Sequence, residues 1–322
     1  MLTLFALLAC KPTPTPPPTP VPDPDGTADT ALTIHTAETG LGDVPVFDCT
    51  NLPSSGFPSR IVPGARAYHG LAFDTLGNLV GSNGDSLIRV AASDVAELWL
   101  PAVGSGQQMD FLPDGDLAFS AFAVRRISPD GNNQVIASNV NAYGLIVGPD
   151  GFIYTANQSQ VHRINPQNGN RVVYVSGVSS PKVINWSPGL DKFYVGTNGS
   201  DGEVWMFDID PSTLMATSGP QLLGRTSNTW HDALGVDVCG NVYVAEFWDR
   251  RLWRITPDGE ETVLIDYPSS LYGHGLVWGS GIGEWDAMNA YIPQPYNGNT
   301  VTEITLGIPD RRYNGGVYDT IF

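Results

Sequence analysis

The sequence predicts an all-β protein, a six-bladed β-propeller that is closed by an N-terminal strand and preceded by a disordered tether. Three observations support this fold class. A unit of roughly 40 residues recurs six times along the chain, which is the spacing of antiparallel propeller blades. Tight turns such as PDG join strands rich in Val, Ile, Tyr, Phe and Trp. No segment with helical periodicity interrupts the repeats.

The N-terminal segment is apolar up to Cys10 and too short to span a bilayer. Its last four residues, Leu7-Leu8-Ala9-Cys10, resemble a bacterial lipobox, in which the cysteine is acylated. We therefore expect a lipoprotein signal over 1–10 and a lipid anchor on Cys10. The alternative is a frayed apolar terminus.

Residues 11–45 are rich in Pro and Thr and then become acidic, which predicts a disordered linker. An anchor, a spacer and a folded domain together indicate a bacterial cell-envelope protein, on the outer membrane or on its periplasmic or extracellular face. Membrane contact is expected only through the lipid. A net charge of −17 argues against nucleic acid as a partner, because phosphate backbones bind clustered Lys and Arg.

The folded domain is expected over 46–322, and its repeats are clearest in three stretches. These read HGLAFDTLGNLVGSNGDSLIRV from His69, YGLIVGPDGFIYTANQSQVHRINPQNG from Tyr143 and DALGVDVCGNVYVAEFWDRRLWRITPDG from Asp232. Each contains an apolar strand, a tight turn, a second strand, a polar gap and a third strand that ends in an Arg-apolar pair. We expect this domain to be a monomer.

The last blade lacks a fourth strand after 300–306. The segment SRIVPGA at 59–65 can supply it and so close the ring, which removes the exposed sheet edges of an open stack. If Cys10 is lipidated, Cys49 and Cys239 remain, and an even pair outside the cytoplasm predicts a disulfide. Two buried free thiols are the alternative.

The repeats resemble the senescence-marker-protein/gluconolactonase (regucalcin-like) family and, more loosely, NHL-type propellers. The resemblance implies a lactone hydrolase with a divalent cation over the central channel, held by Glu, Asn, Asn and Asp. In this sequence the Glu position is His69, and the two Asn positions are Tyr143 and Lys182. Asp232 alone keeps the family residue. Because an ammonium group repels a bound cation, we expect Lys182 to pair with Asp232 instead.

The start of each innermost strand should line one mouth of the channel. Counting back eight residues from the turn glycines, or aligning on the blade tryptophans Trp186 and Trp278, identifies these positions. None of the six residues is apolar, which favours a site over a purely structural role. They are His69, Gln107, Tyr143, Lys182, Asp232 and His274.

Two catalytic hypotheses follow, both with a small-molecule substrate. In the first, a divalent metal, either Zn²⁺ or Ca²⁺, activates water on Asp232, His69 and His274, with His231 in reserve. In the second, a histidine oriented by Asp232 is the general base, and Lys182 and Tyr143 stabilise an oxyanion. The predicted catalytic residues are His69, Lys182, Asp232 and His274, and the predicted substrate-binding residues are Gln107, Tyr143 and Trp230.

Two non-catalytic interpretations stay open. The ring could be a polar plug in a solvated channel. The protein could also be a surface-tethered binding or scaffold propeller with a degenerate metal site, because propellers serve both roles.

Overall fold

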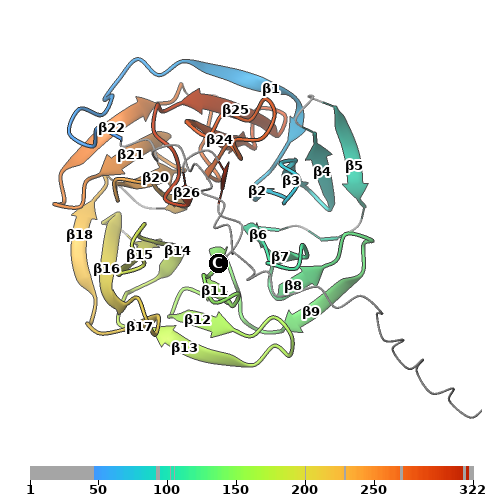
Figure 1. The fold of residues 1–322 in the computed structure, drawn as a ribbon, viewed down its shortest axis with the longest axis horizontal. Coiled ribbons are helices and arrows are strands. Elements are labelled where there is room, and N and C mark those ends of the chain that lie inside the picture. Colours follow the sequence, from blue (N-terminus) through green and yellow to red (C-terminus); the bar gives the residue numbers. More distant parts are fainter. Residues whose placement is uncertain are drawn as a thin grey trace, which may run out of the picture. The chain divides into compact units, whose positions relative to one another are not determined.

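The computed structural model describes residues 47–318, apart from 92–94, 102, 105, 200, 228–229, 269–270 and 315–316. Within these residues the fold is all-β, and six sheets of four or five strands stand around a common axis (Figure 1). The predicted six-bladed propeller is therefore confirmed. Cys10, the signal over 1–10 and the linker over 11–45 lie outside the described residues. In the described part, no helix is long and apolar enough to cross a membrane.

Blades one, two, three and five are antiparallel meanders whose strands run in chain order from the axis outward, whereas in blade four the last two strands both pair with the third. Blade one comprises β2 (Leu71–Phe73), β3 (Leu79–Asn83), β4 (Ser86–Val90) and β5 (Ala96–Leu100). Blade two comprises β6 (Met109–Phe111), β7 (Leu117–Ser120), β8 (Val124–Ile127) and β9 (Asn133–Ala137). Blade three comprises β10 (Leu145–Val147), β11 (Ile153–Ala156), β12 (Val161–Ile164) and β13 (Arg171–Val175).

The second half of the ring repeats the pattern with small variations. Blade four comprises β14 (Pro181–Trp186), β15 (Lys192–Thr197), β16 (Glu203–Asp210), β17 (Met215–Ala216) and β18 (Gln221–Arg225). Blade five comprises β19 (His231–Val236), β20 (Val242–Glu246), β21 (Arg251–Ile255) and β22 (Glu261–Asp266). Blade six contributes β23 (Val277–Trp278), β24 (Asn289–Gln294) and β25 (Thr300–Thr305), and β26 (Tyr313–Asn314) and β27 (Val317–Tyr318) form a separate hairpin.

The ring is closed by an N-terminal strand, as predicted. Strand β1 (Ser59–Arg66) is the outer strand of blade six and pairs antiparallel with β25, Ser59 opposite Ile304. Val62 and Ala65 of this strand are buried in the blade, whereas Ile61 is 54% exposed, and the register shifts between Ile61 and Arg66. The earliest described strand and the last blade are therefore parts of one sheet.

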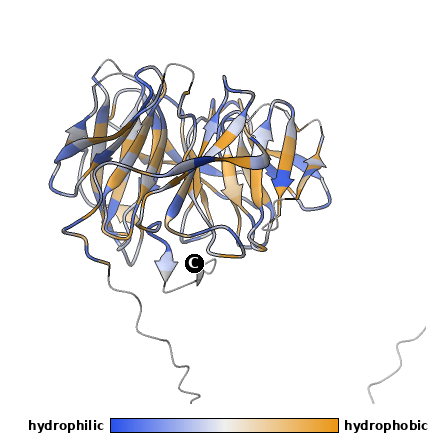
Figure 2. Ribbon diagram, turned by 90° about the horizontal axis from the view of Figure 1, so that it is seen from above, coloured by the Kyte–Doolittle hydropathy of each residue, from blue (hydrophilic) through white to orange (hydrophobic). Residues whose placement is uncertain are grey.

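The core lies between adjacent blades, where apolar faces of neighbouring sheets pack together. Figure 2 shows the hydrophobic residues concentrated along the strands. Blades three and four share an aromatic cluster in which the rings of Tyr154 and Trp186 meet edge-on, 5.3 Å apart. In blades two and three an arginine of the third strand binds the acidic turn: Arg126 contacts Asp116 at 2.5 Å, and Arg163 contacts Asp150 at 2.7 Å.

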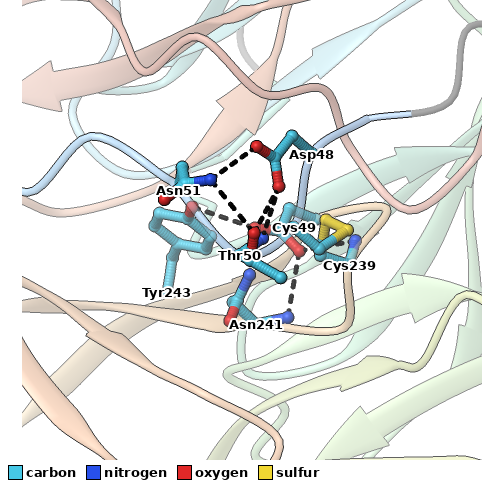
Figure 3. The surroundings of a disulfide bond; sticks show 8 residues. Asp48, Cys49, Thr50, Asn51, Cys239, Asn241 and Tyr243 are labelled. Atoms are coloured by element: carbon cyan, nitrogen blue, oxygen red, sulfur yellow. Dashed lines mark hydrogen bonds between the residues drawn. A yellow bond between two sulfur atoms is a disulfide. The ribbon is translucent and has the colours of Figure 1, made fainter.

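The segments that flank the propeller lie at the same end of the channel. Cys49 and Cys239 form the predicted disulfide, with a Cα–Cα distance of 5.6 Å, at the turn between β19 and β20 (Figure 3). Asp310 forms an isolated antiparallel bridge with Asp237 in the same turn. Blade five therefore holds both the N-terminal and the C-terminal extension.

Candidate active site

Four of the predicted catalytic side chains lie together at the start of the innermost strands. His69 precedes β2, Lys182 lies in β14, Asp232 lies in β19 and His274 precedes β23. These positions meet because every innermost strand begins at the same end of the channel. All four residues are buried, with His69 the most exposed at 8%.

Asp232 is the centre of this cluster. The ammonium group of Lys182 contacts its Oδ1 atom, and the Tyr143 hydroxyl donates a hydrogen bond of 2.8 Å to the same oxygen. The Nε2 atom of His274 lies 3.1 Å from Oδ2. The pairing of Lys182 with Asp232 that we expected from the sequence is therefore present, and three blades besides Asp232's own contribute a polar group to one carboxylate.

The two histidines of the cluster stack on each other. The ring centroids of His69 and His274 are 3.9 Å apart with an interplanar angle of 26°. Burial lowers the pKa of both His69 and His274 to about 3, because a charged imidazole would lose its hydration. Both rings are therefore neutral at neutral pH and are available as proton acceptors or metal ligands.

The amine of Lys182 is also in an unusual environment. Burial lowers its pKa to about 8, although the nearby Asp232 carboxylate opposes this shift. The ammonium lies over the ring of Tyr143 at 4.1 Å and over the ring of Trp230 at 4.6 Å. Lys182 can therefore exchange a proton close to neutral pH.

Aromatic side chains surround the cluster at this end of the channel. Trp230 is 38% exposed and meets the ring of Trp248 edge-on. Phe247 lies against His274, with ring centroids 4.5 Å apart, and Tyr296 is 60% exposed beside it. Such a rim offers stacking surfaces to a small molecule that approaches the cluster.

The structure does not bring His231 into the cluster. Its Nδ1 atom accepts a hydrogen bond from the Thr197 backbone amide at 3.2 Å, so Nε2 carries the proton and donates to the Thr226 hydroxyl at 2.9 Å. Both ring nitrogens are engaged, and His231 has a structural role rather than that of a reserve metal ligand.

The residue of blade two that contacts the cluster is Gln108, and not the predicted Gln107. The Oε1 atom of Gln107 is buried without a hydrogen-bond partner among the described residues, and its side chain makes no hydrogen bond to the cluster. Gln108, which sequence reasoning missed, donates 3.0 Å to the Asp232 carbonyl and accepts from the Leu145 amide at 3.4 Å. The sequence has two successive glutamines here, so either could have been the residue at the channel mouth. The spacing of eight residues from the turn glycine Gly115 selected Gln107.

His69, Asp232 and His274 form a group that could hold a metal ion, with one possible ligand atom from each within 4.8 Å of the others. Calcium does not fit, because it requires six to eight oxygen ligands and this group offers one carboxylate, already in contact with an ammonium. A borderline metal such as Zn²⁺ does fit. Imidazole and carboxylate are its usual ligands, and Asp232 Oδ2 has no hydrogen-bond partner in the described part of the chain.

This fold and cluster define a six-bladed propeller with a buried group of titratable side chains at one end of its channel. Residues 138–279 match the family model described as SMP-30/Gluconolactonase/LRE-like region. The family resemblance inferred from the repeats is thereby confirmed. None of the curated protein sequences matches the chain.

Solved structures share the fold at low sequence identity. A gluconolactonase from Xanthomonas campestris is 15% identical, with a TM-score of 0.65 over 79% of this chain and 90% of that one. Regucalcin from Agrobacterium tumefaciens, a calcium-binding protein, is 15% identical, with a TM-score of 0.65 over 83% and 99%. An auxiliary nutrient binding protein from Bacteroides thetaiotaomicron is 11% identical, with a TM-score of 0.61 over 75% and 69%. These similarities establish the fold.

Proposed function

We propose that this protein hydrolyses lactones or related esters at the cluster around Asp232. One observation carries the proposal: a single buried carboxylate is contacted by the Lys182 amine, the Tyr143 phenol and the His274 imidazole. Titratable groups with displaced pKa values that converge in this way are typical of acid–base catalysis. The match of residues 138–279 to a family model that includes gluconolactonases supports the same reaction class.

His274 is the general base in this proposal. Its Nε2 atom faces Asp232, and its Nδ1 atom is buried without a hydrogen-bond partner among the described residues. Nδ1 can therefore take a proton from an attacking water, while Asp232 stabilises the imidazolium that forms. Lys182 and Tyr143 are the donors for the oxyanion that develops on the substrate carbonyl.

A borderline divalent metal is compatible with the same site. His69, Asp232 and His274 would hold it, and when bound it would lower the pKa of a water molecule. In that case Lys182 would still be a donor for the substrate oxygen.

The test uses the purified domain, residues 46–322, with a panel of aliphatic lactones and aryl esters. The metal content of the domain is measured first. Turnover is then measured for the domain as isolated, after treatment with a chelator and after addition of Zn²⁺. We expect hydrolysis that His274→Ala lowers by about 10²–10⁴-fold. Lys192→Met, which removes a half-exposed lysine of blade four, is the matched control and should leave turnover unchanged. Absence of turnover on the whole panel, or full activity of His274→Ala, would overturn the proposal.

A second candidate is a non-catalytic binding propeller. The nearly complete burial of Lys182 and Asp232 favours it, because a closed ion pair resembles a structural plug more than a reactive site. Under this alternative, a ligand would bind at the aromatic rim without product formation, and His69→Ala would leave its affinity unchanged.

For the location of the protein, we propose a lipid anchor on Cys10 that holds the propeller at the cell envelope. The lipobox-like sequence and the Pro/Thr-rich spacer support it. Metabolic labelling with a radioactive fatty acid should mark the full chain, and Cys10→Ser should abolish the label and release the protein into the soluble fraction. Equal labelling of the wild-type protein and the Cys10→Ser variant would contradict the lipid anchor.

A further inference from the structure

The channel contains a cavity of about 190 Å³ that extends away from the Asp232 cluster. At its inner end it is lined by His69 and Gln108. At its outer end it is lined by Asp74 and Pro113, which belong to the first hairpin turns of blades one and two. It therefore reaches the end of the channel opposite to the catalytic cluster, where the C-terminal segment 310–312 forms part of its wall.

Arg311 is the unusual residue of this wall. Its backbone amide donates to the Val236 carbonyl at 2.9 Å, and its Nε donates to Asn185 Oδ1 at 2.9 Å. These two bonds fix the guanidinium at the edge of the cavity. Among the described residues, Asn185 is its only side-chain hydrogen-bond partner, so both Nη groups are without one. Burial lowers the pKa of Arg311 to about 10, which leaves it positively charged at neutral pH.

The neighbouring carboxylates are bound to other groups. Asp310 accepts from the backbone amide of Arg312 at 2.8 Å and from its Nε at 3.1 Å. Asp110 accepts from the backbone amides of Phe111 and Val147 at 3.0 and 2.9 Å. Neither forms an ion pair with Arg311. A partly buried guanidinium whose Nη groups have no side-chain hydrogen-bond partner among the described residues is a site for an anion, and its fork geometry matches a carboxylate.

The remaining lining combines the carboxylates of Asp74, Asp110 and Asp310 with a larger apolar part. The apolar part includes Phe73, Met109, Phe111, Ile184, Leu234 and Trp278. An apolar protein cavity of about 150 Å³ is large enough to bind benzene. A volume of about 190 Å³ therefore accommodates one ring or a branched chain with a small polar head.

We propose that this cavity binds a small monocarboxylate with a compact apolar body, of the size of benzoate, and that the Nη groups of Arg311 bind its carboxylate. The apolar walls select the body of the ligand and Arg311 selects its charge. The cavity extends away from the proposed hydrolytic cluster and shares only His69 with it, and the inference does not depend on hydrolysis.

Calorimetric titration with benzoate and with benzyl alcohol, its neutral analogue, tests the site. We expect the wild-type domain to bind benzoate about 10- to 100-fold more tightly than benzyl alcohol, since one partner of the hydrogen bond is charged. Arg311→Met should abolish this preference. Arg171→Met removes an exposed arginine of β13 and is the matched control, which should keep the preference intact.

Three results would overturn the assignment: no binding of benzoate, equal affinity for the two probes, or an unchanged preference in Arg311→Met. The last would place the anion elsewhere, for example at Lys182. Circular dichroism establishes that the variants are folded. If Arg311→Met does not fold, Arg311→Lys decides the question, because it keeps the charge but loses the bidentate fork and should bind benzoate about tenfold more weakly. Unchanged affinity of Arg311→Lys would then contradict the proposal.

Discussion

The ammonium group of Lys182 in blade four lies against the Oδ1 atom of Asp232 in blade five, and the two side chains are only 2% and 1% exposed. Both charges have been removed from water, so each depends on the other for compensation. This contact also joins two adjacent blades at the centre of the ring, whose strands belong to separate sheets.

The first prediction concerns this pair. Lys182→Met should lower the free energy of unfolding by about 3–5 kcal/mol, because it leaves the Asp232 carboxylate buried without its partner. The double variant Lys182→Met/Asp232→Asn should be less destabilised than the single one, since no isolated charge remains. Urea unfolding measures both values.

The control for this prediction is the half-exposed pair Lys192–Asp208 of the same blade. Lys192→Met should cost less than about 1 kcal/mol, because solvent screens exposed ion pairs. Equal losses for Lys182→Met and Lys192→Met would mean that burial does not determine the contribution of the inner pair.

The second prediction concerns the closing strand. Val62 and Ile61 are adjacent in β1, but Val62 is fully buried and Ile61 is 54% exposed. Val62→Ala should lower the unfolding free energy by about 2 kcal/mol through the cavity it leaves, whereas Ile61→Ala should change it by less than about 0.5 kcal/mol. Thermal and urea unfolding provide the comparison, and a reversed order would argue against the register of β1 on β25.

The third prediction concerns the disulfide. Cys49 and Cys239 are 190 residues apart in sequence, so the bond restricts a long loop in the unfolded chain. Cys239→Ser should lower the stability by about 2–5 kcal/mol. A reducing agent should bring the wild-type domain to the same lower melting temperature and leave the variant unchanged. A wild-type melting temperature that is insensitive to reductant would rule out this contribution.

The fourth prediction concerns acid unfolding. Burial lowers the pKa of His231 to about 3 in the folded protein, with Lys182 adding to the effect, so the folded state holds the neutral ring. This stabilisation is complete above the unfolded pKa of about 6.5 and is lost as the pH falls from there toward 3. His231→Gln should reduce the pH dependence of the unfolding free energy by about 1.4 kcal/mol per pH unit between pH 6 and 4. An unchanged slope in that range would show that His231 does not titrate in this way.

Much of the fold could be predicted from the sequence because its determinants are local and repeated. Turn glycines such as Gly77 and Gly151 have positive φ angles, and they recur at fixed distances from the strand starts. Since innermost strands begin at one end of the channel, the glycine spacing placed His69 and Asp232 in one cluster. The blade tryptophans Trp186 and Trp278 placed Lys182 and His274 there as well.

Finer features depended on information that repeats do not carry. His231 and Asp232 are adjacent in β19, and adjacent strand residues point to opposite sides, so only one of them can face the channel. A register shift between His231 and Ala233 occurs at this point, and it has no local sequence marker. Arg311 lies beyond the last repeat, so no register existed from which its place in the channel wall could be inferred.

The pairing of β1 with β25 also constrains how the chain is made. Ser59 is opposite Ile304, so nearly the whole domain must leave the ribosome before the ring can close. Until then, the free edge of the last blade and the apolar face of β1 are available to other chains, and contacts this distant in sequence form slowly. Synthesis of this protein should therefore depend on chaperones that shield the unclosed ring, and truncation within the last blade should produce aggregation rather than a shorter propeller.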